Sequence, residues 1–543
     1  IVRVTLEPIL ARLRGADGRP PRPAQILDLK VCDPAMGSAA FLVEVCRQLG
    51  DALVEAWHAH GELPTIPSDE DEVVFARRQI AQRCLYGVDR NPVAVDLAKV
   101  SLWLVTLAKD HALTFVDHAL RHGDSLVGLS RKQIEAFHWD PSAKTFREGF
   151  GMMQVREHLA KAASLRQQIR GADEGVSDWE LRDLWDEAQL EVGKVRLFGD
   201  LVLVAYFDGD KPKEREARRR EFTSLVATGE AERHRGMLEE LRHADPALAP
   251  FHWEIELPEV FDRENPGFDA IVGNPPFAGK NTVAAGNVAR YPEWLQELHA
   301  ESHGNADLVA HFFRRSFDLV RKDGAFGLIA TNTISQGDTR STGLRWICQH
   351  GGEIFNVTKR VKWPGLAAVV VSVLHVSKGP AHGPKWLDKQ EVEAISAFLF
   401  HGGGSEEPAR LLANSGKSFV GSIVLGMGFT FDDTDRKGVA SSLADMRQLI
   451  ARNVHNQEVI FPYIGGEEVN QSPSHVHHRF VVDFGERSEQ ECRKTWPDLL
   501  SLVEIKVKPE RLENGRESYR RYWWQFGEKR NELRLAIDRI SRV

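Results

Sequence analysis

The chain has 543 residues, of which 42% are hydrophobic and 27% charged, a composition typical of a globular protein with two to four domains. No apolar run reaches the length of a membrane span and no signal peptide opens the chain, which argues against a membrane or exported protein. The formal net charge of −8 does not attract phosphate, so a nucleic-acid partner must be met by local basic surfaces.

The cysteines are odd in number and have no C-x-x-C spacing, which argues against a disulfide framework or structural zinc and favours a reducing cytoplasm. They are Cys32, Cys46, Cys84, Cys348 and Cys492. The chain begins at Ile1 inside a predicted helix, and we expect a fragment of a longer protein at both ends.

Two regions alternate short apolar strands with amphipathic helices. In residues 25–130 the strands are LKVCDP, CLYGVD and a weaker one near LRHGD, and the alternation resumes over residues 268–380. This pattern predicts an α/β domain with a parallel sheet. Residues 50–80, between the first two strands, are expected to hold an insert or a long helix pair.

The intervening residues 145–250 are charged and rich in helical periodicity, apart from a short apolar interruption at LVLVAYF. We interpret them as a helical insertion packed on the sheet domain. The basic stretch KPKEREARRREF within it is a solvated helix face or, as the less favoured alternative, a DNA contact. The loop HGGGSEEP at 401–408 predicts a domain boundary.

The first motif is VCDPAMGSAAF, residues 31–41, in which a strand, a tight turn at Gly37 and a helix follow one another. Such a turn lets the backbone approach a ligand, and the helix start offers free N–H groups. An ordinary strand–turn–helix remains the alternative. The second motif, LYGVDRNP, ends its strand at Asp89, where a carboxylate can accept from ribose hydroxyls.

The third and most specific motif is FDAIVGNPPF, residues 268–277. An adenine N6 amine is a poor nucleophile because its lone pair is delocalised into the ring. The side-chain oxygen of Asn274 and the carbonyl of Pro275 can both accept from that amine and pull its nitrogen toward sp³ geometry. Pro276 helps to fix the backbone, and Phe277 offers a flat face to a base taken out of the stack. The alternative is a strand-end turn with a buried Phe277.

The order of DPAMGSAAF, VDRNP, GDS and GNPPF resembles the gamma class of amino-methyltransferases, in which the cofactor motif precedes the catalytic one. FHWEIELPEVF and IATNTISQGDTR resemble the large methylase polypeptides of type IIG restriction–modification enzymes and of BREX and DISARM phage-defence systems. The resemblance implies a Rossmann-like class I methyltransferase sheet, mostly parallel with one antiparallel strand. It also implies a site-specific DNA adenine-N6 methyltransferase that uses S-adenosyl-L-methionine.

The resemblance assigns roles to residues by their match to the family motifs. For the cofactor, the 31–41 loop would hold the methionine part, Asp89 the ribose, and an aspartate after the third strand the adenine amine, with a further aspartate at a helix start near the pocket. These cofactor residues are Asp33, Pro34, Gly37, Asp89, Asp124 and Asp307. The catalytic residues would be Asn274, Pro275, Pro276 and Phe277, and the base pocket Trp363 and Pro364. No metal is implied.

Two positions depart from the family pattern. The family usually has Gly where Ala39 stands, which affects the cofactor loop, and often Cys where Met36 stands, which we expect to be neutral. The family's Tyr-Thr-Pro cofactor motif, expected just upstream of Ile1, is absent from the sequence.

Four regions follow from these assignments. The cofactor half of the methyltransferase domain would be 1–135, the helical insertion 136–250, the catalytic half 251–380, and a linker with a partial target-recognition region of α+β type 381–543. The expected partners are double-stranded DNA with a flipped adenine and restriction or defence subunits. The alternatives are an enzyme that methylates glutamine amides or RNA guanines, or a DNA-binding defence subunit that has lost methylation.

The C-terminal region contains three weaker signals. PDLLSLVEIK at 497–506 superficially resembles a metal-dependent nuclease core, an interpretation that we disfavour because its acidic residues lie on one continuous segment. HVHH at 475–478 is more typical of a polar loop than of a metal site. The aromatic residues interleaved with basic ones in 506–543 fit DNA binding and inter-domain packing equally well.

Overall fold

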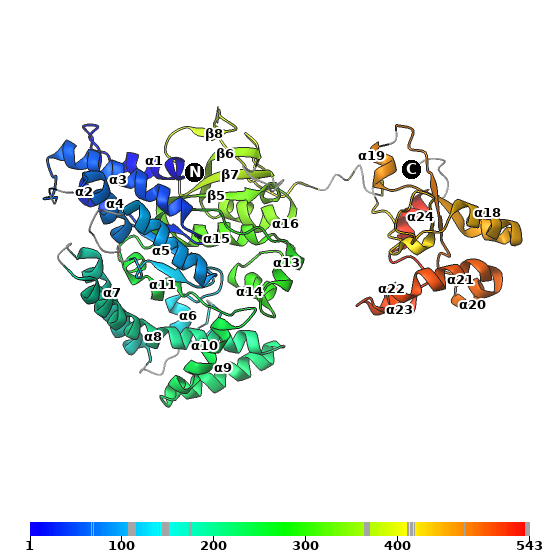
Figure 1. Ribbon diagram of the computed structural model, residues 1–543, viewed down its shortest axis with the longest axis horizontal. Helices are drawn as coiled ribbons and strands as arrows, with labels where there is room; N and C mark the ends of the chain where they lie inside the picture. The colour runs from blue at the N-terminus through cyan, green and yellow to red at the C-terminus, as the bar shows by residue number, and fades with distance from the viewer. Residues whose placement is uncertain are drawn as a thin grey trace. The chain divides into compact units, whose positions relative to one another are not determined.

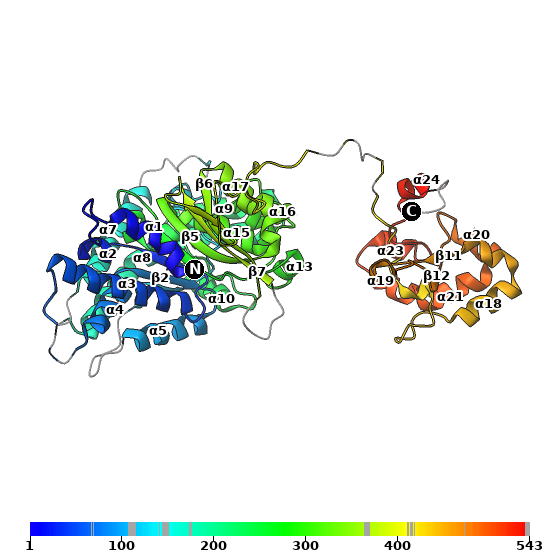
Figure 2. The same ribbon diagram turned by 90° about the horizontal axis from the view of Figure 1, so that it is seen from above.

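The structure is a computed structural model of the chain, and it divides into two compact units, Ile1–Glu407 and Pro408–Val543 (Figures 1 and 2). The division falls at the end of the predicted 401–408 boundary loop. The structure describes all residues except 67, 69, 107–115, 141, 144–150, 173–175, 363–369, 410–411, 413–415, 418, 472 and 538–543.

A nine-stranded sheet forms the centre of the first unit, in the order β3-β2-β1-β4-β5-β7-β6-β8-β9. The strands are β1 Val31–Asp33, β2 Leu85–Asp89, β3 Leu120–His122, β4 Phe268–Gly273, β5 Val320–Thr331, β6 Gly352–Lys362, β7 Val370–Lys378, β8 Lys385–Leu387 and β9 Gln390–Val392. The first five in spatial order are parallel, and β7 runs antiparallel to both of its neighbours. The mostly parallel α/β sheet is therefore confirmed, but β9, antiparallel to β8, adds a second antiparallel strand.

Helices cover both faces of this sheet, as a parallel sheet with apolar strands requires. One face carries α1 (Val2–Leu13), α2 (Pro23–Leu27), α3 (Ala40–His60), α4 (Glu72–Arg83) and α5 (Pro92–Thr106), with Ala270 and Val272 of β4 in the same core. The other face carries α11 (Trp253–Glu256), α12 (Pro258–Phe261), α15 (Leu308–Leu319) and α17 (Trp346–Gln349), packed on Ile271. The expected helix pair within residues 50–80 is α3 and α4.

The helical insertion lies between β3 and β4 in the chain. It contains α6 (Arg131–Glu135), α7 (Gly151–Gly171), α8 (Asp178–Asp208), α9 (Pro212–Ala227) and α10 (Arg235–His243), shown in cyan to green in Figure 1. The expected break at LVLVAYF is wrong, because these residues continue α8. Residues 201–207 are all buried, and a helix that is apolar all round belongs inside a core.

The two ends of the insertion meet in a short ladder beside the sheet. The Asp124 amide donates to the Ala249 carbonyl over 2.7 Å, and the Phe251 amide donates to the Val127 carbonyl over 2.7 Å. The insertion therefore leaves the sheet and returns to it at nearly the same place.

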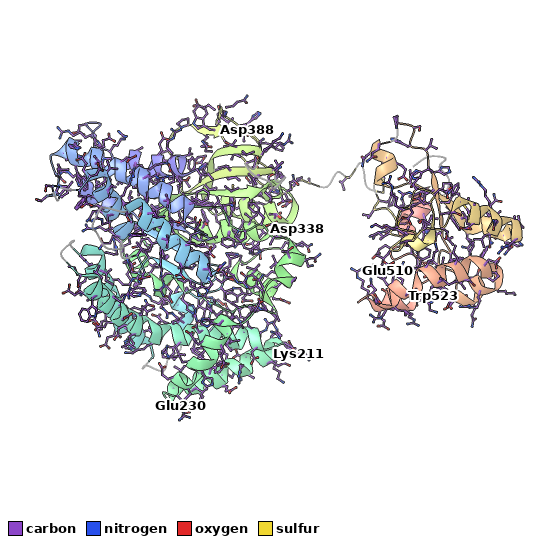
Figure 3. All side chains as sticks on the ribbon, viewed as in Figure 1. Lys211, Glu230, Asp338, Asp388, Glu510 and Trp523 are labelled. Atoms are coloured by element: carbon purple, nitrogen blue, oxygen red, sulfur yellow. The ribbon has the colours of Figure 1, made fainter. Side chains whose placement is uncertain are left out.

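The basic helix α9 lies between Lys211 and Glu230, both labelled in Figure 3. Glu216 accepts from both Arg219 and Arg220 on the same helix. This pairing within one helix supports the solvated helix face.

The second unit, described by itself, has a three-stranded antiparallel sheet in the order β10-β12-β11 and several helices. The strands are β10 Thr430–Phe431, β11 Ile460–Tyr463 and β12 Arg479–Val482. The helices are α18 Leu443–Arg452, α19 Gly466–Gln471, α20 Glu489–Thr495, α21 Pro497–Lys506, α22 Lys508–Leu512, α23 Glu517–Arg521 and α24 Asn531–Ile537. This mixture agrees with the expected α+β class.

Three aromatic residues of 506–543 pack in the core of the second unit itself rather than between domains, and DNA binding by this stretch stays a prediction. Trp523, labelled in Figure 3, is buried in the core of this unit together with Trp524 and Phe526. The nuclease-like residues 497–506 form one helix, α21, and Glu504 on it pairs with Lys508 over 2.7 Å. Within the described residues no cluster of three His, Cys, Asp or Glu side chains could hold a metal ion, and no helix is long and apolar enough to cross a membrane.

Candidate functional site

Four polar side chains gather where neighbouring parallel strands end. Asp33 and Asp89 are the last residues of β1 and β2, Asp124 lies two residues after β3, and Asn274 follows β4 directly. These strands are adjacent in the order β3-β2-β1-β4 and point the same way, so their carboxyl ends form one edge. Open α/β sheets bind ligands at this edge.

Asp33 is completely buried at the centre of this edge. Its Oδ1 accepts from the Ala35 amide over 3.0 Å, whereas its Oδ2 is buried with no hydrogen-bond partner among the described residues. Burial, and to a smaller extent the nearby Asp89 charge, raises the pKa of the Asp33 carboxyl from 3.8 to about 8 although the Ala35 amide lowers it. A cationic group placed against Oδ2 would supply what this carboxyl lacks.

Gly273 brings the end of β4 against Asp33. A Cβ atom on Gly273 would stand 2.6 Å from Asp33 Oδ1, closer than non-bonded atoms approach. The lack of a side chain at Gly273 therefore allows β1 and β4 to present Asp33 and Asn274 side by side.

The turn after β1 is held by Asp89. The Gly37 amide donates to Asp89 Oδ2 over 2.8 Å, and the Asn91 amide donates to Oδ1 over 2.8 Å. Each carboxylate oxygen keeps a lone pair for a further donor. Gly37 has φ +53°, and Ala39, fully buried, has φ +67°, so both adopt the left-handed conformation that favours glycine. The departure at Ala39 thus places an alanine at a strained position.

Asp124 is buried, and burial raises the pKa of its carboxyl. Its Oδ1 accepts from the Leu126 amide over 2.9 Å, and the Tyr291 hydroxyl lies 3.2 Å from Oδ1 and 3.0 Å from Oδ2. The Ser125 hydroxyl donates to the Pro34 carbonyl over 2.5 Å, which ties the loop after β3 to the turn after β1.

Residues 274–277, the NPPF loop, follow β4 without a break. Asn274 is half-buried, and its Oδ1 is fully covered with no hydrogen-bond partner among the described residues. Pro275 is buried, Pro276 is exposed, and Phe277 is half-buried against the core of one sheet face. The loop therefore holds an acceptor oxygen without a partner among the described residues, and the packing alternative for Phe277 retains support.

Asp307 holds the far end of this loop. It caps the N-terminus of α15, and its Oδ1 accepts from the amides of Val309 over 3.0 Å and Ala278 over 3.2 Å. The Leu308 amide donates back to the Ala278 carbonyl over 2.9 Å. These contacts make Asp307 a support of the NPPF loop, while its contact with a cofactor stays a prediction.

The structure thus brings the predicted residues of β1, β2, β3 and β4 together at one edge. Trp363 and Pro364, predicted for the base pocket, lie outside the described residues. Sequence reasoning missed Tyr291 and the close approach at Gly273, because both depend on contacts between residues far apart in the chain. The sequence around Tyr291 signals only an amphipathic helix.

Comparison with known proteins gives consistent matches. Residues 83–349 match the family described as the Eco57I restriction-modification methylase. A candidate type II restriction enzyme and methyltransferase of Methanocaldococcus jannaschii is 22% identical over 358 residues, which cover 58% of this chain and 27% of that protein.

Solved structures of two restriction-modification proteins also align. The type IIL enzyme MmeI in complex with DNA aligns over 97% of this chain and 54% of its own, with 15% identity and a TM-score of 0.49. The M protein of the type I enzyme EcoKI aligns over 67% of this chain and 44% of its own, with 13% identity and a TM-score of 0.29. The chain therefore spans about a quarter of the curated relative and about half of MmeI.

The matched region contains β2 to β5, and with them Asp89, Asp124 and the NPPF loop. Over residues 83–349, just under half of its length, this chain is therefore similar to the Eco57I restriction-modification methylase family.

Proposed function

We propose that the first unit transfers a methyl group from S-adenosyl-L-methionine to the N6 amine of adenine in DNA. The observation that carries the proposal is the pair formed by Asp33 and Asn274. Asp33 ends β1 and Asn274 directly follows β4, its parallel neighbour, and each has a buried side-chain oxygen with no partner among the described residues. The Asp33 oxygen suits a cationic donor, and the Asn274 oxygen suits the N–H group of a neutral amine.

The residues at this edge fit the cofactor. Its ammonium group, ribose hydroxyls and adenine amine are three sets of donors, and Asp33, Asp89 and Asp124 are three carboxylates on consecutive strands, each with acceptor capacity left. Gly37 leaves open space beside the turn, since a Cβ atom there would meet nothing within 4 Å. When bound, the cofactor supplies an electrophilic methyl group on a positively charged sulfur.

The chain's own part in the reaction is to prepare the amine. Asn274 Oδ1 and the Pro275 carbonyl would accept hydrogen bonds from the two N–H groups of the amine in divergent directions, so the nitrogen lone pair is withdrawn from conjugation with the ring and the surplus proton leaves to solvent after the transfer. Proline fixes φ and holds that carbonyl in place. Positioned acceptors act without reorganising during the step, which is the main source of catalysis expected here.

DNA would have to present its adenine outside the duplex. Asn274 is half-buried at the carboxyl edge of the sheet. A base stacked inside a DNA duplex cannot reach such a position unless it is flipped out of the helix. We propose that Phe277 stacks on this base, that restriction or defence subunits are the protein partners, and that the protein works in the cytoplasm.

The test is methyl transfer by variants of Asn274. Asn274→Ala should lower transfer of labelled methyl groups to DNA by at least a hundredfold while cofactor affinity stays within about threefold, since only an acceptor at the reacting amine is lost. Asn274→Asp, which keeps an oxygen acceptor, should retain more activity. Asn305→Ala is the matched control, because the Asn305 side chain contacts Lys280 and Asp338 at the exposed surface.

Identification of the product base completes the test. N6-methyladenine in the modified DNA supports the proposal, and a methylated cytosine or no DNA methylation overturns it. Asn274→Ala activity within tenfold of the parent would remove Asn274 from the mechanism.

A further inference from the structure

Tyr291, which the family motifs do not include, makes direct contact with the site. It is the first residue of α14 (Tyr291–Leu298), only 14 positions after Phe277, and it is 4% exposed. Its hydroxyl lies 3.2 Å from Oδ1 and 3.0 Å from Oδ2 of Asp124. One phenol therefore bridges both oxygens of a buried carboxylate.

This contact determines the orientation of the Asp124 side chain. The Leu126 amide donates to Oδ1 over 2.9 Å, and the single hydroxyl proton of Tyr291 is shared between Oδ1 and the nearer Oδ2. A carboxylate oxygen accepts about two hydrogen bonds. Oδ2 therefore keeps acceptor capacity for a ligand donor, and rotation of the carboxylate would break the bond from Tyr291.

Other contacts hold α14 in place. The Trp294 indole donates to the Leu126 carbonyl over 2.8 Å, so α14 contacts the loop after β3 at a second point. The Trp294 ring also packs against Tyr206 and Phe207 of α8, with centroid distances of 5.2 and 5.9 Å. The helical insertion thus supports the helix that carries Tyr291.

We propose that Tyr291 is a positioning residue that aims the Asp124 carboxylate at the exocyclic amine of the cofactor purine and makes the site select an amino-purine over an oxo-purine. The proposal rests on the proposed function. An aimed carboxylate accepts from an amine but repels a carbonyl oxygen, so selectivity depends on its orientation. A carboxylate free to turn would lose part of this discrimination.

The experiment measures a ratio of affinities on the full chain. The probes are S-adenosylhomocysteine and S-inosylhomocysteine, which carries a carbonyl oxygen in place of the amine. The parent should bind the adenosyl compound at least tenfold more tightly, and Tyr291→Phe should reduce this ratio about tenfold. Loss of packing alone would weaken both compounds equally and leave the ratio unchanged.

Tyr86→Phe is the control, because the buried Tyr86 hydroxyl on β2 has no hydrogen-bond partner among the described residues, so the same substitution there removes no contact with a carboxylate. It should leave the ratio within about twofold of the parent. Asp124→Asn supplies a second measurement in which no carboxylate remains to be aimed. In that background Tyr291→Phe should change the ratio no further. If Tyr291→Phe does not fold, Asp124→Asn alone still tests the proposal, because without a carboxylate the preference for the adenosyl compound should be lost, and a preference that persists overturns it.

The outcomes separate the two proposals. If the parent prefers the adenosyl compound and Tyr291→Phe keeps that preference, the role of Tyr291 is wrong while the proposed function stands. If the parent binds both compounds equally, Asp124 does not distinguish the amine and the role is again wrong. If the parent binds neither compound, the proposed cofactor fails, and the inference about Tyr291 fails with it.

Discussion

The Asp33 carboxylate and Gly273 lie on neighbouring strands so close together that any side chain on Gly273 would strike the carboxylate, with 2.6 Å between its Cβ and Asp33 Oδ1. The strands that carry them, β1 and β4, are more than 230 positions apart in the chain and pair in parallel. This contact brings the region proposed for the cofactor against the region proposed for the base.

Gly273→Ala should separate these two strand ends. The new methyl group meets a buried carboxylate that has no free space, so we expect at least a tenfold loss of cofactor affinity and a lower melting temperature. Gly279→Ala is the matched control, because a Cβ atom at Gly279 meets nothing within 4 Å. Calorimetric titration and thermal melting measure both effects, and equal behaviour of the two variants would contradict the close approach.

Asp33 should make stability fall as pH rises. Its pKa is raised to about 8 in the folded protein, so the folded chain keeps a proton that the unfolded chain loses above about pH 4. The contribution of Asp33 to the free energy of unfolding is fully present below pH 4 and is lost as pH rises toward 8. Without cofactor, the melting temperature of the parent should therefore fall relative to that of Asp33→Asn between pH 5 and pH 8, and parallel curves would refute the raised pKa.

Cofactor binding should release the proton held by Asp33. A cationic ammonium group beside the carboxyl favours its charged form, so binding at pH 7 should release up to one proton and binding at pH 9 almost none. Titrations in buffers of different ionisation enthalpy measure this number. Asp33→Asn should abolish the release, and a release that persists in this variant would assign the proton to another group.

Ala39→Gly should be close to neutral for stability. Glycine relieves the left-handed strain at this position, which is about 1–2 kcal/mol. It also removes a buried methyl group and increases the chain entropy of the unfolded state, and these two effects together lower the free energy of unfolding by about as much. Ala162 is equally buried but lies inside α7. Ala162→Gly should therefore lose stability from the missing methyl group and the added chain entropy, with no release of backbone strain to offset the loss. Ala39→Val should cost about 3 kcal/mol or more, because a β-branched residue fits neither the φ angle nor the space. Denaturant unfolding ranks the three variants.

Phe277 should act mainly as a flat surface. Stacking on a base contributes about 1–3 kcal/mol, and any aromatic side chain supplies much of it, so Phe277→Tyr and Phe277→Trp should keep more activity than Phe277→Ala. Fluorescence of 2-aminopurine at a mapped target position should rise on binding of the parent. If Phe277→Ala melts many degrees lower and the probe never brightens, Phe277 belongs to the core against which it packs.

The elements with strong local signals were predicted correctly. The strands β1, β2 and β4 are short apolar runs followed by turn residues, and both strand identity and the position of Asp33, Asp89 and Asn274 follow from that pattern. The hairpin of β8 and β9 was not predicted, because these edge strands are three residues long and largely polar.

Other features could not be predicted from local sequence. The stretch 201–207 was expected to interrupt a helix because it is apolar throughout, and only the surrounding core shows that a helix can be buried on all sides. The contact of Tyr291 with Asp124 joins residues 167 positions apart, and no local pattern reports such a pair.

The ladder that closes the insertion, where Asp124 meets Ala249 and Val127 meets Phe251, divides the polypeptide into two halves. The first half contains the carboxylates of Asp33, Asp89 and Asp124, the second contains the NPPF loop, and the strands β1 and β4 pair side by side. A chain cut within the insertion would leave these contacts in place, so the two pieces should reassemble when mixed. The proposed methyl transfer should therefore require both halves, because the residues proposed for the cofactor and those proposed for the base come from different ones.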